Sequence, residues 1–284
     1  MSAPASTVAR AATKRPHLTH FLMIPLGHIP DLRDRVSLFT NALLATEPVI
    51  AGLDMSVIIP PRRLHLTLGV LSLVKQQSQA KDSSQTTINA AVDLLHRLKS
   101  DLDRAVCPDG KVTVPLVAMD IMRSGKGKST PHVLHIGPSE LEGTALKRVT
   151  DVVYHAFKTA GLLQDDRPLK LHCTVVNTIY RKPRSKSRIP FDYASIRQSA
   201  AVASILEPQP ATRQSLAAPP EDAQPEAAAA PTSRKDDGRR RLNKPELHID
   251  LGVWTVDEVQ LCEMGSHAED GAYVCVGSVP LFSG

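Results

Sequence analysis

The sequence predicts an α+β fold in which two lobes face each other across a cleft, and three observations support this prediction. Strand-like and helix-like segments alternate, giving strand–helix–strand units in two successive halves of the chain. Each half contains one apolar strand that is interrupted by a His-x-Thr pair, at residues 64–70 and 171–177. With 42% hydrophobic residues among 284, the chain can bury a sizeable core.

The first half of the sequence is predicted to contain a helix with one strand before it and one after it. Apolar residues recur every three or four positions in the helical segment, and Asp31 after Pro30 is its expected N-cap. A short apolar run then ends at two consecutive prolines. In chain order these segments are the strand Leu18–Leu26, the helix Leu32–Ala45, the run Met55–Pro60 and the first motif strand Leu64–Val74, followed by a polar loop at 75–86.

The second half repeats this alternation with longer helices. Two segments are amphipathic at helical spacing, and Gly161 is a typical stop after the second. Apolar and polar residues alternate in the segments between them, which predicts strands. In chain order the expected elements are the helix Ile88–Val106, the strands Val112–Met122 and His132–Ile136, the helix Leu141–Ala160 and the second motif strand Leu169–Tyr180.

The last third of the chain is interrupted by a biased segment at about 207–244. It is rich in proline and alanine and then basic, and it lacks the large apolar side chains that offset ordering entropy, so we expect a disordered insertion. Its basic end, at Arg239–Arg241, is a candidate nuclear-import signal or RNA patch, or a plain solvated charge run. The fold is expected to resume at Glu246, with alternation over Leu247–Val253 and a final pair of strands at Val256–Cys262 and Ala272–Val279.

The two His-x-Thr strands carry the candidate active site. Side chains alternate faces along a strand, so His65 and Thr67 share one face, as do His172 and Thr174, while the apolar residues between them face a core. One imidazole can take a proton near neutral pH while the other gives one, and a Thr hydroxyl can donate a hydrogen bond to a phosphate oxygen. The pattern therefore points to phosphoester cleavage or transfer, and it needs neither a metal nor a cofactor.

These motifs resemble the paired signatures of the 2H phosphoesterase superfamily. The neighbouring residues narrow the resemblance to the A-kinase anchor protein 7-like phosphoesterase domain, over about Leu18–Leu281 apart from insertions. The residues that carry it are Thr19-His20-Phe21-Leu22, Arg63 to Gly69, Lys170 to Thr178, and Val259 to Gly265 followed by Tyr273. The resemblance implies a two-lobed, LigT-like fold with antiparallel sheets, outer helices, an approximate two-fold axis and a central cleft.

Together, the motifs and the resemblance predict a metal-independent phosphodiesterase with His65, Thr67, His172 and Thr174 as catalytic residues. Its expected substrates are RNA or oligonucleotide phosphodiesters with 2′,3′-cyclic or 2′,5′/3′,5′ linkages. The alternative is a non-catalytic nucleotide- or RNA-binding module in a nuclear transcription-coactivator (cointegrator-type) or repair complex. One member of the family carries an RNA-binding KH domain ahead of its phosphoesterase domain. Residues 1–17 are too few for such a domain, so we expect a disordered N-terminus and a single domain over 18–284.

The charge distribution suggests where an acidic substrate would bind. The net charge is +5, and residues 181–188 hold five basic residues and no acid just after the second motif. A basic loop at a cleft mouth attracts a phosphodiester backbone, although a merely solvated insertion loop has the same composition. Tyr180, Arg181, Lys182 and Arg184 are therefore the candidate substrate-binding residues.

The remaining features predict a monomer in the nucleus, the cytoplasm or both. No run approaches the roughly 18 apolar residues of a membrane span, and the N-terminus lacks an apolar signal-peptide core. The four cysteines are scattered without a Cys-x-x-Cys, which favours reduced core or strand residues over a disulfide framework or a zinc site. His132 and His135 flank a strand at a spacing that puts them on opposite faces, which argues against a shared metal.

Overall fold

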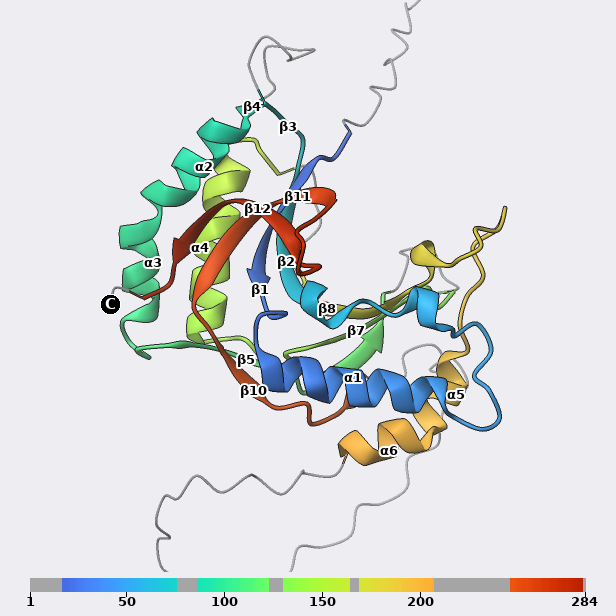
Figure 1. Ribbon diagram of the computed structural model, residues 1–284. Helices are drawn as coiled ribbons and strands as arrows, with labels where there is room; N and C mark the ends of the chain where they lie inside the picture. The colour runs from blue at the N-terminus through green and yellow to red at the C-terminus, as the bar shows by residue number, and fades with distance from the viewer. Residues whose placement is uncertain (1–16, 76–85, 123–129, 164–168, 207–245, 283–284) are drawn as a thin grey trace, which may run out of the picture.

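The computed structural model describes residues 17–75, 86–122, 130–163, 169–206 and 246–282. Its main feature is one eight-stranded sheet in the order β12-β11-β1-β2-β8-β7-β6-β9, in which all neighbours are antiparallel (Figure 1). The expected insertion and N-terminus lie almost wholly outside the described residues. The strands of this sheet are β1 (His20–Pro25), β2 (His65–Leu71), β6 (Ala118–Ile121), β7 (Val133–Gly137), β8 (Cys173–Asn177), β9 (Leu247–His248), β11 (Glu258–His267) and β12 (Tyr273–Pro280).

The sheet has two halves of four strands, which meet between the two motif strands. The pair Leu66 and Cys173 joins β2 to β8 at this junction. The half that contains β2 is completed by β11 and β12 from the end of the chain, so the two halves are interleaved along the sequence. Two small sheets add to this frame, β5 (Val112–Pro115) with β10 (Val253–Val256) and β3 (Leu73–Val74) with β4 (Thr86–Thr87).

Six helices of the described chain pack around the sheet in two groups (Figure 1). In one group α2 contacts β12, while α4 contacts β2 and α3. In the other, α1 packs on α6, and α5 reaches β6 through the Tyr193 hydroxyl, 3.4 Å from the carbonyl oxygen of Met119. The helices are α1 (Pro30–Leu44), α2 (Ile88–Arg97), α3 (Lys99–Val106), α4 (Ala145–Thr159), α5 (Tyr193–Gln198) and α6 (Ala200–Leu206).

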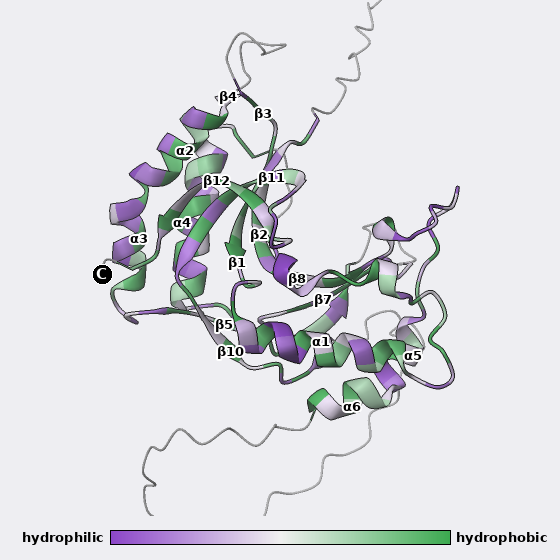
Figure 2. Cartoon of the chain, viewed as in Figure 1, coloured by the Kyte–Doolittle hydropathy of each residue, from purple (hydrophilic) through white to green (hydrophobic). Residues whose placement is uncertain are grey.

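Two apolar clusters lie on opposite faces of the first half-sheet. The large core takes the alternate residues of β2, including Leu66 and Leu68, which are fully buried against the helices. A smaller cluster of Phe21, Met23 and Cys262 lies on the other face, the one that carries the His-x-Thr side chains. In Figure 2, β1 and β2 are largely green, which marks the hydrophobic residues that these strands contribute to the clusters.

Several expected elements have different boundaries in the structure. The helix expected at 88–106 is two helices that meet at Leu98, and the strand expected at 112–122 divides after Pro115, where β5 joins β10 and β6 joins the main sheet. Pro30 begins α1, and Ile29 is at the N-cap, so Asp31 lies in the first turn beside the positive end of the helix dipole. Helices α5 and α6 were not expected from the sequence.

Candidate active site

The four His-x-Thr side chains lie together on one face of the β2–β8 junction. Because Leu66 faces Cys173 in this antiparallel pair, extending the register by one residue sets His65 opposite Thr174 and Thr67 opposite His172. Each imidazole is therefore a cross-strand neighbour of the other motif's threonine, and the two histidines are diagonal neighbours across the strand pair. The four side chains are half-buried, whereas Leu66 and Cys173 on the opposite face are fully buried.

Both catalytic candidates are held by the same backbone contact. The Nδ1 atom of His65 lies 2.7 Å from the carbonyl oxygen of Arg63, and that of His172 lies 2.7 Å from the carbonyl oxygen of Lys170. A carbonyl only accepts, so Nδ1 carries the proton in each neutral ring and Nε2 presents its lone pair. The repeated sequence, a basic residue, a leucine and then the histidine, thus produces two imidazoles in one tautomer.

The side chains around His65 are aromatic. Its ring lies 5.3 Å from the ring of Phe21 and 5.3 Å from that of Tyr273, the latter in an edge-on arrangement. Burial lowers the pKa of His65 to about 4, the hydrogen bond to Arg63 opposes this shift, and the charge of His172 adds to it. His65 is therefore neutral in the free protein at neutral pH.

The side chains around His172 are polar. The ring of His135 lies 5.3 Å away, and His135 is the neighbour of Thr174 on β8 and of Asp120 on β6. His135 is 4% exposed, and its Nε2 has no hydrogen-bond partner within the described chain. Burial, followed by the charges of His172 and Lys170, lowers the pKa of His135 to about 3 against the opposing charge of Asp120, and burial also lowers the pKa of His172.

Phe21, Tyr273 and His135 were not predicted as site residues, although the family resemblance includes Phe21 and Tyr273. The sequence places them on three different strands, and only the register of the folded sheet brings them beside the motifs. The expected opposite orientations of His132 and His135 agree with the structure, since His132 Nδ1 lies 2.9 Å from Thr178 Oγ1 while His135 lies beside His172. The three-residue spacing of His132 and His135 was the one sequence signal that placed these two side chains on different faces.

Tyr180 ends the short 3₁₀ turn η4 (Thr178–Tyr180) that follows β8. Its side chain interacts electrostatically with that of Tyr273 on β12, whose ring contacts His65. Burial is the main cause that raises the pKa of Tyr273 to about 12.

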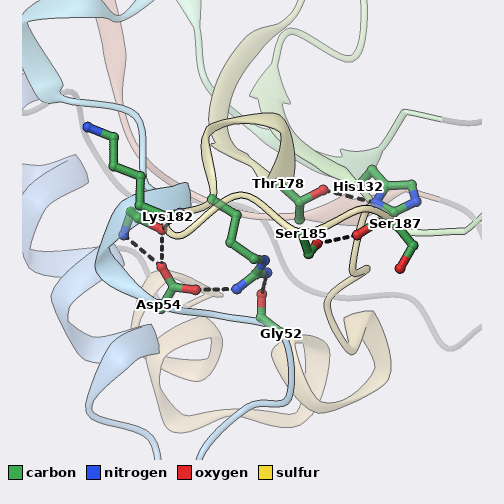
Figure 3. A network of polar contacts seen from close by, with 9 residues as sticks. Gly52, Asp54, His132, Thr178, Lys182, Ser185 and Ser187 are labelled. Carbon is green, nitrogen blue, oxygen red and sulfur yellow. Dashed lines mark hydrogen bonds and ion pairs between the residues drawn. The ribbon is translucent and has the colours of Figure 1, made fainter.

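The basic loop at 181–188 is anchored by two of its own arginines. Figure 3 shows the polar contacts of Gly52, Asp54 and Thr178 beside this loop. Arg181 forms an ion pair with Asp54, and its Nη2 donates to the carbonyl oxygen of Gly52 at 2.6 Å. Arg188 donates to Thr178 Oγ1 at 2.8 Å. Gly52 has φ +78°, and a Cβ there would lie 2.0 Å from the carbonyl oxygen of Pro190, so this approach requires glycine.

The other three basic residues of this loop, Lys182, Arg184 and Lys186, have exposed side chains. The loop is the hydrophilic extension beside η4 in Figure 2. The contacts of Arg181 fix its position at the start of the loop, and Tyr180, Arg181, Lys182 and Arg184 remain the substrate-binding residues that we propose. Within the described ranges, no group of three or more His, Cys, Asp or Glu side chains could hold a metal ion, and no helix is long and apolar enough to cross a membrane.

Comparison with known proteins identifies the family. Residues 18–212 match the model of the AKAP7 2′5′ RNA ligase-like domain. The chain is 26% identical over 178 residues to activating signal cointegrator 1 complex subunit 1 of Mus musculus, covering 62% of this chain and 47% of that protein. It thus spans about half the length of this curated relative.

Solved structures with an overall likeness include Escherichia coli LigT complexed with 3′-AMP and TT0787 of Thermus thermophilus. The LigT complex gives a TM-score of 0.46 at 11% identity, covering 94% of this chain and 99% of that chain. TT0787 gives a TM-score of 0.45 at 14% identity, covering 93% and 97%. These likenesses are too distant to support a functional argument, so the assignment rests on the family match, which includes both His-x-Thr strands. The chain belongs to the AKAP7 2′5′ RNA ligase-like domain family.

Proposed function

We propose that this protein is a metal-independent phosphodiesterase that acts on RNA or oligonucleotides, at 2′,3′-cyclic or 2′,5′/3′,5′ phosphodiesters. The observation that carries the proposal is the paired arrangement of His65 and His172, each fixed at Nδ1 by a backbone carbonyl and each opposite a threonine. The family's description as 2′5′ RNA ligase-like supports the same class of substrate.

The two imidazoles supply both proton transfers of the reaction. With a 2′,3′-cyclic phosphate, one imidazole takes a proton at Nε2 from the attacking water as the new P–O bond forms. The other imidazole, protonated on both nitrogens, gives its Nε2 proton to the ribose oxygen as the old P–O bond breaks. In a 2′,5′ linkage the neighbouring 3′-hydroxyl replaces water, and the 5′ oxygen leaves. Thr67 and Thr174 donate hydrogen bonds to the non-bridging oxygens.

This mechanism requires one neutral and one protonated imidazole. In the free protein the pKa values of His65 and His172 both lie below the ordinary value of 6.5. A phosphodiester anion between them favours the charged form of the nearer imidazole and raises its pKa. Substrate binding therefore creates the acid that the reaction needs, while the second imidazole remains a base.

The decisive experiment measures turnover of cyclic, 2′,5′-linked and 3′,5′-linked oligonucleotides by the wild type in EDTA. His65→Gln and His172→Gln should each lower turnover by about 10²–10⁴-fold, the usual contribution of a general acid or base. His155→Gln, at an exposed position on α4, is the matched control and should turn over normally. Full activity in either motif variant, or activity that a divalent cation restores after chelation, would contradict this mechanism.

The alternative is a binding module, and the match to a subunit of a cointegrator complex supports it. In that case the protein would be a non-catalytic nucleotide- or RNA-binding part of a nuclear transcription-coactivator or repair complex. The same assay separates the two functions. Binding of the oligonucleotides without turnover by the wild type, weakened in His65→Gln and His172→Gln, would favour the binding module.

A further inference from the structure

Two cysteines lie opposite each other in the half of the sheet that contains the His65 strand. Cys262 on β11 and Cys275 on β12 are paired in the antiparallel ladder, and both are free thiols. The ladder is irregular on both sides of this pair, with a register shift between Leu261 and Cys262. Opposed residues of a regular antiparallel pair have Cα atoms about 4.5–5.5 Å apart. This range falls within the roughly 4.4–6.8 Å that a disulfide spans, so bond formation needs little backbone movement.

The two thiols differ in exposure and in acidity. Cys275 is exposed, whereas Cys262 is fully buried. Cys262 Sγ lies 3.5 Å from Gln260 Oε1, and Cys275 Sγ lies 3.4 Å from the carbonyl oxygen of Gly277. Interaction with the Cys262 side chain lowers the pKa of Cys275 to about 7, against burial and the charge of Glu258, while the same interaction raises the pKa of Cys262. An exposed thiolate beside a second thiol is the usual arrangement of an oxidation-sensitive cysteine.

The pair is close to the side chains that surround His65. Cys262 is the ladder neighbour of Phe21 and packs in the same small apolar cluster. Tyr273 precedes Cys275 by two positions on β12 and packs on that cluster. The rings of both Phe21 and Tyr273 contact His65, so the cysteine pair is one layer of side chains away from the candidate catalytic centre.

We propose that Cys262 and Cys275 form a redox modification site, which a peroxide converts reversibly into an intramolecular disulfide. The Cys275 thiolate attacks one peroxide oxygen, the O–O bond breaks, and Cys275 becomes a sulfenic acid. The departing hydroxide takes up the proton that the Cys275 thiol released on ionising and leaves as the first water. The Cys262 sulfur then attacks the sulfenic sulfur, the S–S bond forms, and the departing hydroxide takes the Cys262 proton as a second water. The dithiol loses two electrons, and hydrogen peroxide is reduced to two waters.

The other two cysteines do not share these properties. Cys173 is buried, and burial raises its pKa to about 12, which keeps it protonated and unreactive. Cys107 is exposed at the end of α3, outside the main sheet, and no cysteine of the described chain is paired with it in a strand ladder. Cys107 is therefore the natural control for exposure without a partner thiol.

The test treats the reduced full-length protein with hydrogen peroxide and counts thiols after denaturation. We expect a loss of two thiols from the four cysteines, one peptide linking Cys262 to Cys275, and full recovery with dithiothreitol. In Cys262→Ser, oxidation should stop at a Cys275 sulfenic acid that dimedone traps. In Cys275→Ser, Cys262 should stay reduced, and Cys107→Ser should form the disulfide as the wild type does.

Retention of all four thiols, a disulfide through Cys107, or only intermolecular disulfides would overturn the proposal. A Cys262→Ser protein without a dimedone adduct at Cys275, while the wild type forms the disulfide, would overturn the proposed order of attack. These readouts are chemical and need no substrate. The redox site and the phosphodiesterase function can therefore fail independently of each other.

Discussion

The pKa values of two histidines determine how the proposed activity should depend on pH. Burial lowers the pKa of both His65 and His172, so the form with one neutral and one protonated imidazole is most populated in the free protein below pH 6.5. We expect kcat/KM, which reports the free protein, to be maximal on the acid side of pH 6.5 and to fall about tenfold per pH unit above the higher of the two pKa values. In the substrate complex the phosphate anion raises these pKa values, so kcat should peak at a higher pH.

Steady-state kinetics between pH 4 and pH 9, with the wild type and Thr67→Ser, would check this expectation. The serine keeps the hydroxyl and leaves both imidazoles in place, so its pH profile should match that of the wild type. A kcat/KM profile that rises through pH 8 would contradict the assignment of the two imidazoles as acid and base.

Single residues also show what strand alternation can and cannot predict. Alternation places His65 and Thr67 on one face and the intervening leucine in the core, and the structure agrees. It carries no information on which residue of another strand lies alongside. Tyr273 and His135 reach the site through cross-strand register, which depends on β-bulges such as the one between Leu134 and His135.

At the scale of elements, the basic loop divides its charges between two roles. Arg181 and Arg188 are used in anchoring contacts, and Lys182, Arg184 and Lys186 remain exposed beside η4. Changing the three exposed residues to Gln should weaken binding of a short RNA at low salt and flatten its salt dependence, because fewer counterions are released. A mononucleotide, which reaches only the His-x-Thr pairs, should bind almost as before.

Binding of both ligands across a salt series measures this effect. The matched control changes three exposed basic residues near the opposite helices, Arg97, Arg104 and Lys111, to Gln. If the salt dependence of RNA binding is unchanged in the loop variant, or changes equally in the control, the loop does not bind the RNA backbone.

Element boundaries were less predictable than the elements themselves. The apolar spacing over 88–106 is continuous, so nothing in the pattern marks the break at Leu98 between α2 and α3. Pro115 is a visible strand breaker, but the reason for the division is tertiary, because β5 pairs with a strand from the end of the chain. A local sequence pattern carries no information about pairing with such a distant strand.

At the scale of the whole molecule, the chain segments before and after the long insertion lie next to each other. The amide of Asp250 donates to the carbonyl oxygen of Ile205 at 2.6 Å, so the chain before residue 207 and the chain after residue 245 meet. Replacing residues 207–244 by a short Gly/Ser linker should leave the free energy of unfolding unchanged or raise it by about 1 kcal/mol, since a shorter loop costs less closure entropy. Chemical denaturation of the two proteins measures the difference.

A deletion that starts instead at Ala200 is the control for this experiment. It removes α6 and with it the buried side chains of Val202 and Ile205, and should destabilise the protein clearly. Strong destabilisation by the linker variant itself would show that 207–244 contributes to the fold.

Loss of nuclear accumulation in the linker variant would support Arg239–Arg241 as an import signal, and an unaltered distribution would leave that run as a solvated linker.

The approximate two-fold symmetry of the two lobes was expected from the family resemblance and not from periodicity. Alternation predicted two successive halves, whereas β11 and β12 return from the end of the chain to complete the half that β1 and β2 begin. The composition of a strand does not specify which distant strand it pairs with, so interleaving of this kind has no local signal.

Buried histidines should make the stability of the whole molecule depend on pH. The folded pKa of His135 is about 3 and that of His65 about 4, both below the ordinary value of 6.5, so the unfolded chain binds protons first as the pH falls. Their contribution to stability is complete above about pH 6.5 and is lost progressively as the pH falls toward the folded values. His135 is 4% exposed, and at pH 5 its low folded pKa alone should lower the free energy of unfolding by on the order of 2 kcal/mol.

His135→Phe keeps a ring in this position and cannot take the proton, so its free energy of unfolding should fall less between pH 7.5 and pH 5. Urea unfolding at both pH values, with His155→Phe on the exposed side of α4 as the control, measures this difference. Equal losses in wild type and His135→Phe would mean that His135 is protonated in the folded protein at pH 5.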